Sequence, residues 1–364
     1  MSIKGWCPGA WRPMMSGDGL IVRIRPRLAR LTRDQILGLC TLSQSHGNGI
    51  IDLTSRANLQ MRGIKEHDHQ TVLTQLQSLD LIDATPEAEA KRNIVTIPLW
   101  QDGDLTTRLH TAILDTLPKM PTLPAKMGIA IDTGPQPILT NTSADFRFER
   151  SADTLVLRAD GAPNGKAITE AEAPQTLLDL AKWFVSTNGP ASGRMAKHLK
   201  STPLPADWQD TSPAAAAPPL QPGGTTYGAP FGSIDATALA ALINDSQATT
   251  LRVTPWRLFI LENATPCAPH GFITDANDPL LHTHACPGAP ACAAATVDTR
   301  QLARQMATPG LHVSGCDKGC AHPRRATTTL VGRDGTFDLV ENGHPWDAPR
   351  ATGLTAKDLL TPAS

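Results

Sequence analysis

The sequence predicts an α+β protein with two related strand–helix–strand units, a mixed α/β region between them and a C-terminal region rich in cysteine. Three observations support this fold class. A strand–helix–strand pattern near the N-terminus recurs in the second half of the chain. A segment rich in Pro, Ala and Gly precedes the second copy, and four of the seven cysteines lie close together near the C-terminus.

The first unit occupies the beginning of the 364-residue chain. Residues 19–25 alternate apolar and basic side chains, as a half-buried strand does. A helix follows, because Thr32 and Gln35 have the spacing of a capping box and lead into an apolar helical face. Residues 50–53 predict a second strand, and residues 54–64 predict a loop that enters a third strand.

The second unit echoes the first. Residues 232–245 predict a helix capped at Asp235, and residues 249–261 predict strand structure after it. In both units a Thr, a nearby Arg and an apolar strand follow one another. This order indicates an internal duplication, and chance similarity of two short αβ segments is the alternative.

A mixed α/β region is predicted between the two units. Residues 85–200 contain apolar runs typical of strands and of an amphipathic helix. Residues 201–230 are rich in Pro, Ala and Gly, which is typical of a linker between domains.

Charge and composition exclude several classes of partner. Lys and Arg total 33 and Asp and Glu total 34, so a net charge of -1 provides no field for nucleic acid or an anionic membrane. We find no secretory signal pattern and no apolar stretch of membrane-spanning length, so we expect a cytoplasmic protein. In a reducing compartment, clustered cysteines favour metal binding or catalysis over disulfides.

Two short loops carry the clustered cysteines. Five residues separate Cys286 from Cys292 and three separate Cys316 from Cys320, and each loop contains the Gly or Pro of a tight turn. Four thiolates that converge on one small volume are the ligand set of a [4Fe-4S] cluster. Zinc, which prefers two to four residues between paired cysteines, is the main alternative, and four unligated core thiols are another. The remaining cysteines are Cys40, predicted in the helix core, and Cys7 and Cys267, whose roles stay open.

These loops resemble those of the sirohaem-dependent nitrite and sulfite reductase family, in which C-x5-C precedes G-C-x2-G-C-x-H/R-P. Residues 17–64 look like that family's ferredoxin-like half-domain, with Thr54-Ser55-Arg56 matching its T-[TS]-R motif, and residues 231–261 look like the second half-domain. The resemblance covers nearly the whole chain. It is closest to the precorrin-3B synthase branch, on four segments: Cys7-Pro-Gly, IDLTSRANLQMRGI from Ile51, LRVTPWR from Leu251 and VSGCDKGCAHP from Val313.

The resemblance implies a nitrite/sulfite reductase-like fold, with duplicated ferredoxin-like half-domains, α/β domains and a C-terminal Fe-S region. The division that it implies is a first half-domain at 1–75, an α/β tetrapyrrole-cavity domain at 85–200, a linker at 201–230, a second half-domain at 231–262 and a [4Fe-4S]-binding domain at 263–364.

The same resemblance implies an iron–sulfur monooxygenase of aerobic cobalamin biosynthesis. Its reaction would be the O2-dependent hydroxylation of precorrin-3A at C20 with lactone formation, and its electrons would come ultimately from NAD(P)H, directly or through a reductase. Its cofactors would be a [4Fe-4S] cluster and a mononuclear non-haem iron. Two alternatives stay open: a sirohaem-dependent nitrite or sulfite reductase, and a tetrapyrrole-binding or electron-transfer protein without catalysis. Asp317 and Lys318 stand where the reductases usually have Pro and Asn, which disfavours the first alternative.

Four basic residues are candidates for binding the carboxylate arms of a tetrapyrrole, since Arg binds carboxylates through two parallel hydrogen bonds. Arg56 matches the T-[TS]-R arginine, Arg92 matches the arginine of the family's R-N-V motif, and Lys126 matches the first lysine of its K-F-K motif. Arg257 is the fourth candidate. Gly128 replaces the second lysine, and we expect this change to open space for a bulky substrate. The alternative for each cation is a solvated surface charge.

Three histidines lie next to the cysteines in sequence. His282 and His284 precede Cys286, and His322 follows Cys320. They are candidates either for the ligands of a mononuclear iron or for hydrogen bonds to a cluster sulfur.

Overall fold

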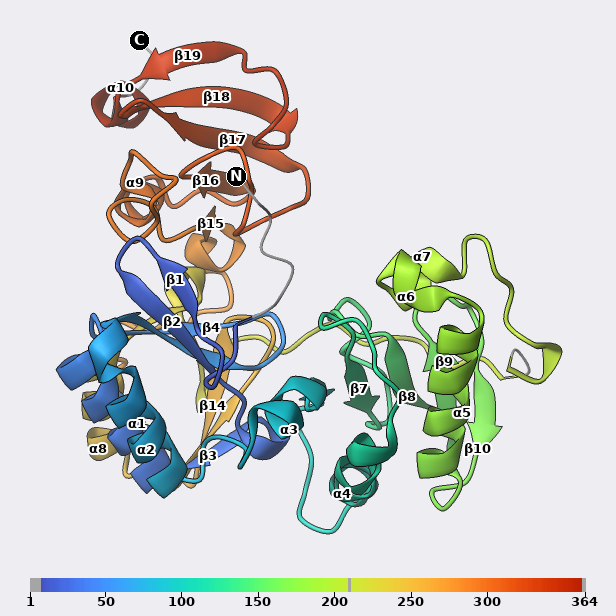
Figure 1. Ribbon diagram of the computed structural model, residues 1–364. Coiled ribbons are helices and arrows are strands. Elements are labelled where there is room, and N and C mark those ends of the chain that lie inside the picture. Colours follow the sequence, from blue (N-terminus) through green and yellow to red (C-terminus); the bar gives the residue numbers. More distant parts are fainter. Residues whose placement is uncertain (1–7, 209–210, 362–364) are drawn as a thin grey trace.

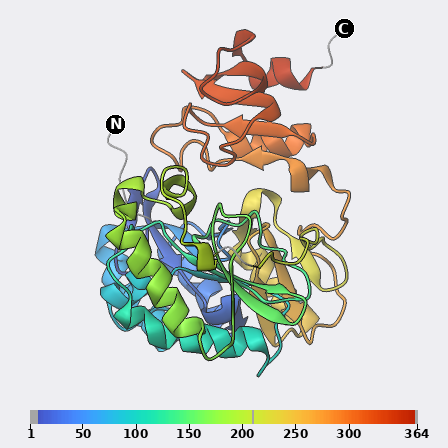
Figure 2. The same ribbon diagram turned by 90° about the vertical axis from the view of Figure 1, so that its right-hand side faces the viewer.

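The computed structural model describes residues 8–208 and 211–361, which form three parts (Figure 1). We call them the central body (residues 8–82 and 223–273), the lateral lobe (residues 94–208) and the C-terminal lobe (residues 279–361). In Figure 1 the C-terminal lobe stands above the central body, and the lateral lobe lies beside it. Figure 2 shows the C-terminal lobe projecting from the rest of the molecule.

The central body holds two antiparallel sheets that share one core. One sheet has the order β1-β2-β5-β4-β12 and the other β11-β14-β13-β3. The helices α1 and α8 contact each other, and buried side chains of both helices pack with both sheets in one apolar cluster. The elements of this body are β1 (Met14–Ser16), β2 (Gly19–Ile24), β3 (Arg30–Thr32), α1 (Arg33–His46), β4 (Ile50–Leu53), β5 (Leu59–Ile64), α2 (His69–Ser78), β11 (Thr226–Gly228), β12 (Ser233–Asp235), α8 (Ala236–Ser246), β13 (Thr250–Val253) and β14 (Leu258–Glu262).

The predicted duplication is confirmed, and its two copies exchange strands. Strand β3 of the first copy pairs with β13 of the second, and β12 of the second pairs with β4 of the first. The backbone before the two exchanged strands is also similar, because Leu28 and Phe231, each two positions before its strand, have positive φ, at 52° and 61°. Each copy therefore completes a sheet of the other, and the body folds as one unit.

The helix caps predicted from the sequence are present in both copies. The Thr32 side chain accepts a hydrogen bond from the Gln35 N–H and the Gln35 side chain accepts from the Thr32 N–H, which is a complete capping box. Asp235 caps α8 by accepting from the Ala238 N–H at 2.9 Å. These bonds satisfy backbone donors that the first turn of a helix leaves free.

The lateral lobe is a mixed sheet with its own apolar core. Its strand order is β10-β9-β8-β7-β6, with β6, β7 and β8 parallel and the others antiparallel. Helices α4 and α5 pack together over it. Its elements are β6 (Ile94–Thr96), α4 (Leu105–Thr116), β7 (Ile129–Asp132), β8 (Phe146–Ser151), β9 (Thr154–Ala159), β10 (Lys166–Ile168), α5 (Ala173–Ser186), α6 (Gly189–Ser192) and α7 (Met195–His198), and α3 (Pro86–Lys91) connects it to the central body.

The C-terminal lobe is a five-stranded sheet of order β15-β16-β17-β18-β19. Strands β15, β16 and β17 are parallel, and the last two pairings are antiparallel. Its elements are β15 (His284–Ala285), α9 (Thr299–Met306), β16 (Leu311–Ser314), β17 (Ala326–Arg333), β18 (Thr336–Gly343), β19 (Ala351–Leu354) and α10 (Ala356–Leu360).

The α+β class is confirmed, while the division into domains at the predicted boundaries stays a prediction. Residues 226–228 of the predicted linker form β11, which pairs with β14. Cys40 lies in the apolar core, as predicted, and Cys7 lies outside the described residues.

Candidate functional site

The two cysteine loops leave adjacent parallel strands at the same edge of the C-terminal sheet. Cys286 directly follows β15, and Cys316 follows β16 after one glycine. His284 is registered with His312 in this strand pair. Because parallel strands end on the same side, the loops 286–292 and 316–320 begin beside each other.

Close backbone packing joins the loops. The Gly315 N–H donates a hydrogen bond to the Cys286 Sγ at 3.1 Å. A Cβ at Gly315 would lie 2.6 Å from the Cβ of Ala295 and 3.4 Å from that sulfur, so only glycine fits between the loops. Such N–H groups stabilise thiolates and set the potential of iron–sulfur clusters.

The four predicted cysteine ligands lie within electrostatic reach of one another. Burial raises the pKa of the Cys316 and Cys320 thiols, and repulsion from the neighbouring cysteines raises the pKa of both further. Cys286 is buried, Cys292 and Cys316 are half-buried, and Cys320 is exposed. A bound cation would favour the thiolate forms of Cys316 and Cys320, whose pKa is raised in its absence.

The donor set fits an iron–sulfur cluster better than a single metal ion. Among the described residues, no group of three or more His, Cys, Asp or Glu side chains is arranged to hold one ion. A zinc ion binds all its thiolates at about 2.3 Å, which draws the sulfurs together. A cubane holds its four cysteines further apart, since each sulfur binds a different iron. The approach of the two loops at one sheet edge is compatible with a [4Fe-4S] cluster.

Residues of the central body bind the first cysteine loop through hydrogen bonds and close packing. The Ser16 hydroxyl and the Arg62 guanidinium donate to the Ala291 carbonyl oxygen at 2.8 and 3.0 Å. A Cβ at Gly17 would lie 2.7 Å from the Ala293 nitrogen, which makes glycine necessary at this close approach. Arg62 is itself held by Asp18. The β1–β2 hairpin thus fixes the loop that carries Cys292.

Two of the three predicted histidines meet beside the cysteines. The rings of His284 and His322 stack with centroids 4.0 Å apart, and the ring of His312 lies 5.7 Å from that of His322. His312, which the sequence analysis did not single out, is fully buried, and neither of its ring nitrogens has a partner within the described residues. His282 ends a short helical turn and does not join this group.

The histidine group does not fit a mononuclear iron. The guanidinium of Arg257 lies 2.6 Å from the Nδ1 of His284, which leaves only Nε2 of this ring for a metal ion. Burial and Arg257 lower the pKa of His284 to about 2, and burial lowers the pKa of His312 to about 4. The rings are therefore neutral, but in the described part of the chain they do not converge on one point.

The four predicted basic residues occupy different environments. Arg56 reaches from the β4–β5 turn to the lateral lobe, where its Nη2 donates to the Lys126 carbonyl oxygen at 2.8 Å and to the Ser143 Oγ at 3.0 Å. Lys126 is exposed, and its ammonium has no bonding partner among the described residues. Arg92 is buried, and its Nε contacts both carboxylate oxygens of Asp83 at 2.8 and 2.9 Å.

Arg257 is not the structural counterpart of Arg56. In each copy, the residue with positive φ in the strand-connecting turn is three positions after a threonine: Ala57, at 52°, and Arg257, at 62°. Trp256 therefore takes the place of Arg56. Arg257 instead turns toward the C-terminal lobe, where it donates to the Thr283 carbonyl oxygen at 3.0 Å and contacts His284. Burial lowers the pKa of Arg257 to about 10.

Gly128 does not open space as expected. A Cβ at this position would lie 2.9 Å from both the backbone oxygen and the Nδ2 of Asn93. Close packing of the backbone against Asn93 therefore requires glycine here. The lysine missing from the family motif could not be restored without moving Asn93.

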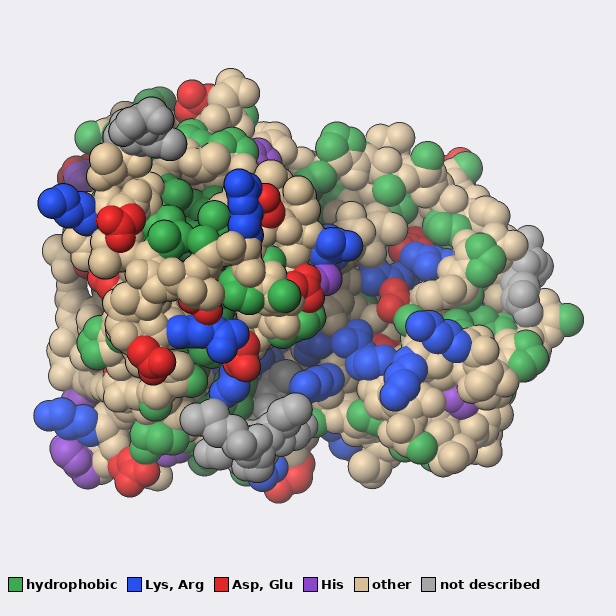
Figure 3. Space-filling model, turned by 90° about the horizontal axis from the view of Figure 1, so that it is seen from above, with side chains coloured by type: hydrophobic (Ala, Val, Ile, Leu, Met, Phe, Trp, Pro, Cys, Tyr) green, Lys and Arg blue, Asp and Glu red, His purple; other side chains and the backbone are tan. Residues whose placement is uncertain are grey.

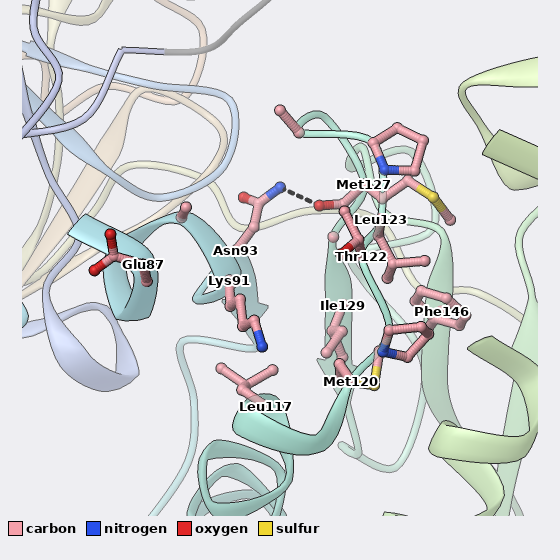
Figure 4. A pocket seen from close by; sticks show the side chains of 15 residues that line it. Glu87, Lys91, Asn93, Leu117, Met120, Thr122, Leu123, Met127, Ile129 and Phe146 are labelled. Atoms are coloured by element: carbon pink, nitrogen blue, oxygen red, sulfur yellow. Dashed lines mark hydrogen bonds between the residues drawn. The ribbon is translucent and has the colours of Figure 1, made fainter. Parts of the chain in front are cut away.

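Basic side chains gather in a hollow between the lateral lobe and the other parts (Figure 3). Arg56 and Lys126 lie where the lateral lobe meets the central body. An apolar cavity of about 310 Å³ is lined in part by residues 120–125 and 127–129, on either side of Lys126 (Figure 4). Pro124, Met127 and Phe146 contribute to its lining, and none of the cysteines does. A charged ligand would therefore fit the basic hollow better than this apolar cavity.

Comparisons with known proteins agree with this architecture. The family model of the nitrite/sulfite reductase ferredoxin-like half domain matches residues 12–79. A precorrin-3B synthase from Sinorhizobium sp is 27% identical over 395 residues, covering 96% of this chain and 85% of that protein. The solved structure of NirA from Mycobacterium tuberculosis has a TM-score of 0.66 at 17% identity, covering 94% of this chain and 79% of that one. The resemblance found in the motifs and the nitrite/sulfite reductase-like fold are thereby confirmed.

None of the helices in the described residues combines the length and apolarity needed to cross a bilayer.

Proposed function

We propose that this protein is a precorrin-3B synthase, an iron–sulfur oxidoreductase that hydroxylates precorrin-3A at C20 with O2 and closes a lactone. The observation that carries this proposal is the convergence of the two cysteine loops at one sheet edge. Similarity to a precorrin-3B synthase along 96% of the chain supports the choice of substrate.

The proposed reaction balances with one dioxygen molecule and two electrons. Precorrin-3A gains one oxygen atom from O2, and the second oxygen atom leaves as water with two protons. NAD(P)H supplies the electron pair, directly or through a reductase. The acetate arm of ring A closes the lactone within the same molecule, so ring closure adds no further atom.

The chain's own residues have two roles in this proposal. Cys286, Cys292, Cys316 and Cys320 would hold the [4Fe-4S] cluster, whose chemistry is to accept and pass on single electrons. The Gly315 N–H would stabilise the Cys286 thiolate.

Arg56 and Lys126 would orient the macrocycle by binding its carboxylate arms in the basic hollow. Arg257 would hold His284 in place beside the cysteines, because its bonds already go to that ring and to the Thr283 carbonyl oxygen. No role follows for a mononuclear iron, since the described residues offer it no fitting ligand group.

An isotope experiment tests the reaction. Anaerobically purified protein is mixed with precorrin-3A, NADPH and a reductase, then exposed to ¹⁸O2. We expect a product heavier by one labelled oxygen atom and no conversion under nitrogen. Unlabelled product, or a purified protein that shows a sirohaem Soret band and reduces nitrite or sulfite, would overturn the proposal.

A further inference from the structure

Arg194 lies at the junction of the lateral lobe and the central body, near Arg56 and Lys126, and no sequence motif marks it. It lies between α6 and α7 in the lateral lobe, with one third of its side chain exposed. Its Nε contacts both oxygens of Asp145 at 2.9 and 3.1 Å, and its Nη2 donates to the Ser143 Oγ and the Ala144 carbonyl oxygen, both at 3.1 Å. In the described part of the chain, Nη1 has no partner.

Asp145 holds Arg194 next to the Lys126 turn. This carboxylate is fully buried and also accepts from the Met195 N–H at 2.9 Å and from the Gly128 N–H at 3.1 Å. One carboxylate therefore fixes both the loop that carries Arg194 and the turn that carries Lys126. Such fixation reduces the entropy that Arg194 would lose on binding a ligand.

Two guanidinium groups from different parts of the molecule meet at one hydroxyl. Arg56, from the central body, and Arg194, from the lateral lobe, donate to the Ser143 Oγ at 3.0 and 3.1 Å. Like charges this close repel each other, and the repulsion is strongest where water is partly excluded. Lys126 is exposed, and its own carbonyl oxygen accepts the other hydrogen bond of the Arg56 Nη2. An anion that binds here would be attracted by Arg56, by the exposed Lys126 and by Arg194, whose charge Asp145 already pairs.

We infer that Arg194 is a further substrate-binding residue, which together with Arg56 and Lys126 binds one carboxylate arm of a tetrapyrrole. The inference rests on the proposed function for the identity of its ligand. A carboxylate fits better than a larger oxyanion, because a guanidinium presents two parallel donors that match its two oxygens. Because Arg56 and Arg194 come from different parts, the bound arm also bridges the central body and the lateral lobe.

Equilibrium binding of a stable probe tests the inference. Uroporphyrin III, which carries eight carboxylates, is titrated by fluorescence against wild type, Arg194→Gln and Arg194→Lys, and its uncharged octamethyl ester is titrated in parallel. Arg108→Gln is the matched control, since Arg108 is an exposed arginine of the same lobe paired with Glu170. We expect Arg194→Gln to weaken uroporphyrin binding about tenfold or more, and Arg108→Gln to change it by less than about twofold.

The remaining outcomes separate the possible failures. If Arg194→Gln does not fold, Arg194→Lys decides, because an ammonium keeps the charge but loses the parallel donors; we expect binding about threefold or more weaker. An affinity within about twofold of wild type in the folded variant, an equal loss with the ester, or no porphyrin binding by wild type would overturn the inference. If Arg194→Gln weakens uroporphyrin selectively but wild type adds no oxygen to precorrin-3A, the reaction fails while the role of Arg194 stands.

Discussion

Breaking the buried ion pair between Arg92 and Asp83 should destabilise the junction between the central body and the lateral lobe. The two side chains are 8% and 9% exposed, and both carboxylate oxygens of Asp83 contact the Nε of Arg92. Arg92→Met keeps most of the side-chain volume but leaves the Asp83 carboxylate buried without its cation. Removing one partner of a buried pair typically costs about 3–5 kcal/mol.

Native-state hydrogen exchange measures this cost locally, because the chain has several parts that need not unfold together. We expect Arg92→Met to lower the free energy of opening of α3 and β6 by about 3 kcal/mol or more. The double variant with Asp83→Asn should recover part of this loss, since no charge then remains buried. Arg108→Met is the control, because its exposed pair with Glu170 contributes about 1 kcal/mol at most. A loss in Arg92→Met no greater than in this control would refute the reasoning.

Three further predictions concern the cysteine loops and a buried acid. Cys292→Ala should lose the bound iron and sulfide yet keep the hydrogen-exchange protection of the central body. The control Cys267→Ala should keep both the cluster and this protection. Full iron content in Cys292→Ala would remove that residue from the ligand set. Gly315→Ala should lower the iron content, because the new Cβ would lie 2.6 Å from the Cβ of Ala295. Adding Ala295→Gly to this variant should restore the iron content. An iron content unchanged by Gly315→Ala alone would contradict the packing argument. Burial raises the pKa of the fully buried Asp132 from 3.8 to about 7, so the native state holds a proton that the unfolded chain has lost, and stability falls as pH rises from about 4 to about 7. Urea unfolding of Asp132→Asn should lack this decline of about 4 kcal/mol, and parallel pH profiles for variant and wild type would refute it.

Local signals in the sequence predicted the central body well. The capping box at Thr32 and the cap at Asp235 depend on residues three positions apart, so a single sequence reveals them. The exchange of β3 and β12 between the two copies could not be predicted in this way. It depends on which strands meet across the body, and the period-2 pattern of a strand carries no information about its partner.

The candidate site was only partly visible in the sequence, because several contacts join residues far apart in the chain. Arg257 was a candidate because an Arg lies close after a Thr in both units, and the positive φ of Ala57 and Arg257 shows that Arg56 and Arg257 differ by one position in the turn. His312 and Arg194 gave no motif signal at all. His312 lies beside His284 because β15 and β16 are adjacent, and Arg194 meets Arg56 at the hydroxyl of Ser143.

Iron and acid-labile sulfide analysis of anaerobically purified protein, combined with EPR of the reduced sample, tests the central claim most directly. The account predicts about four iron and four sulfide per chain and the EPR signal of a reduced [4Fe-4S] cluster. Zinc in place of iron, or iron without inorganic sulfide, would contradict it.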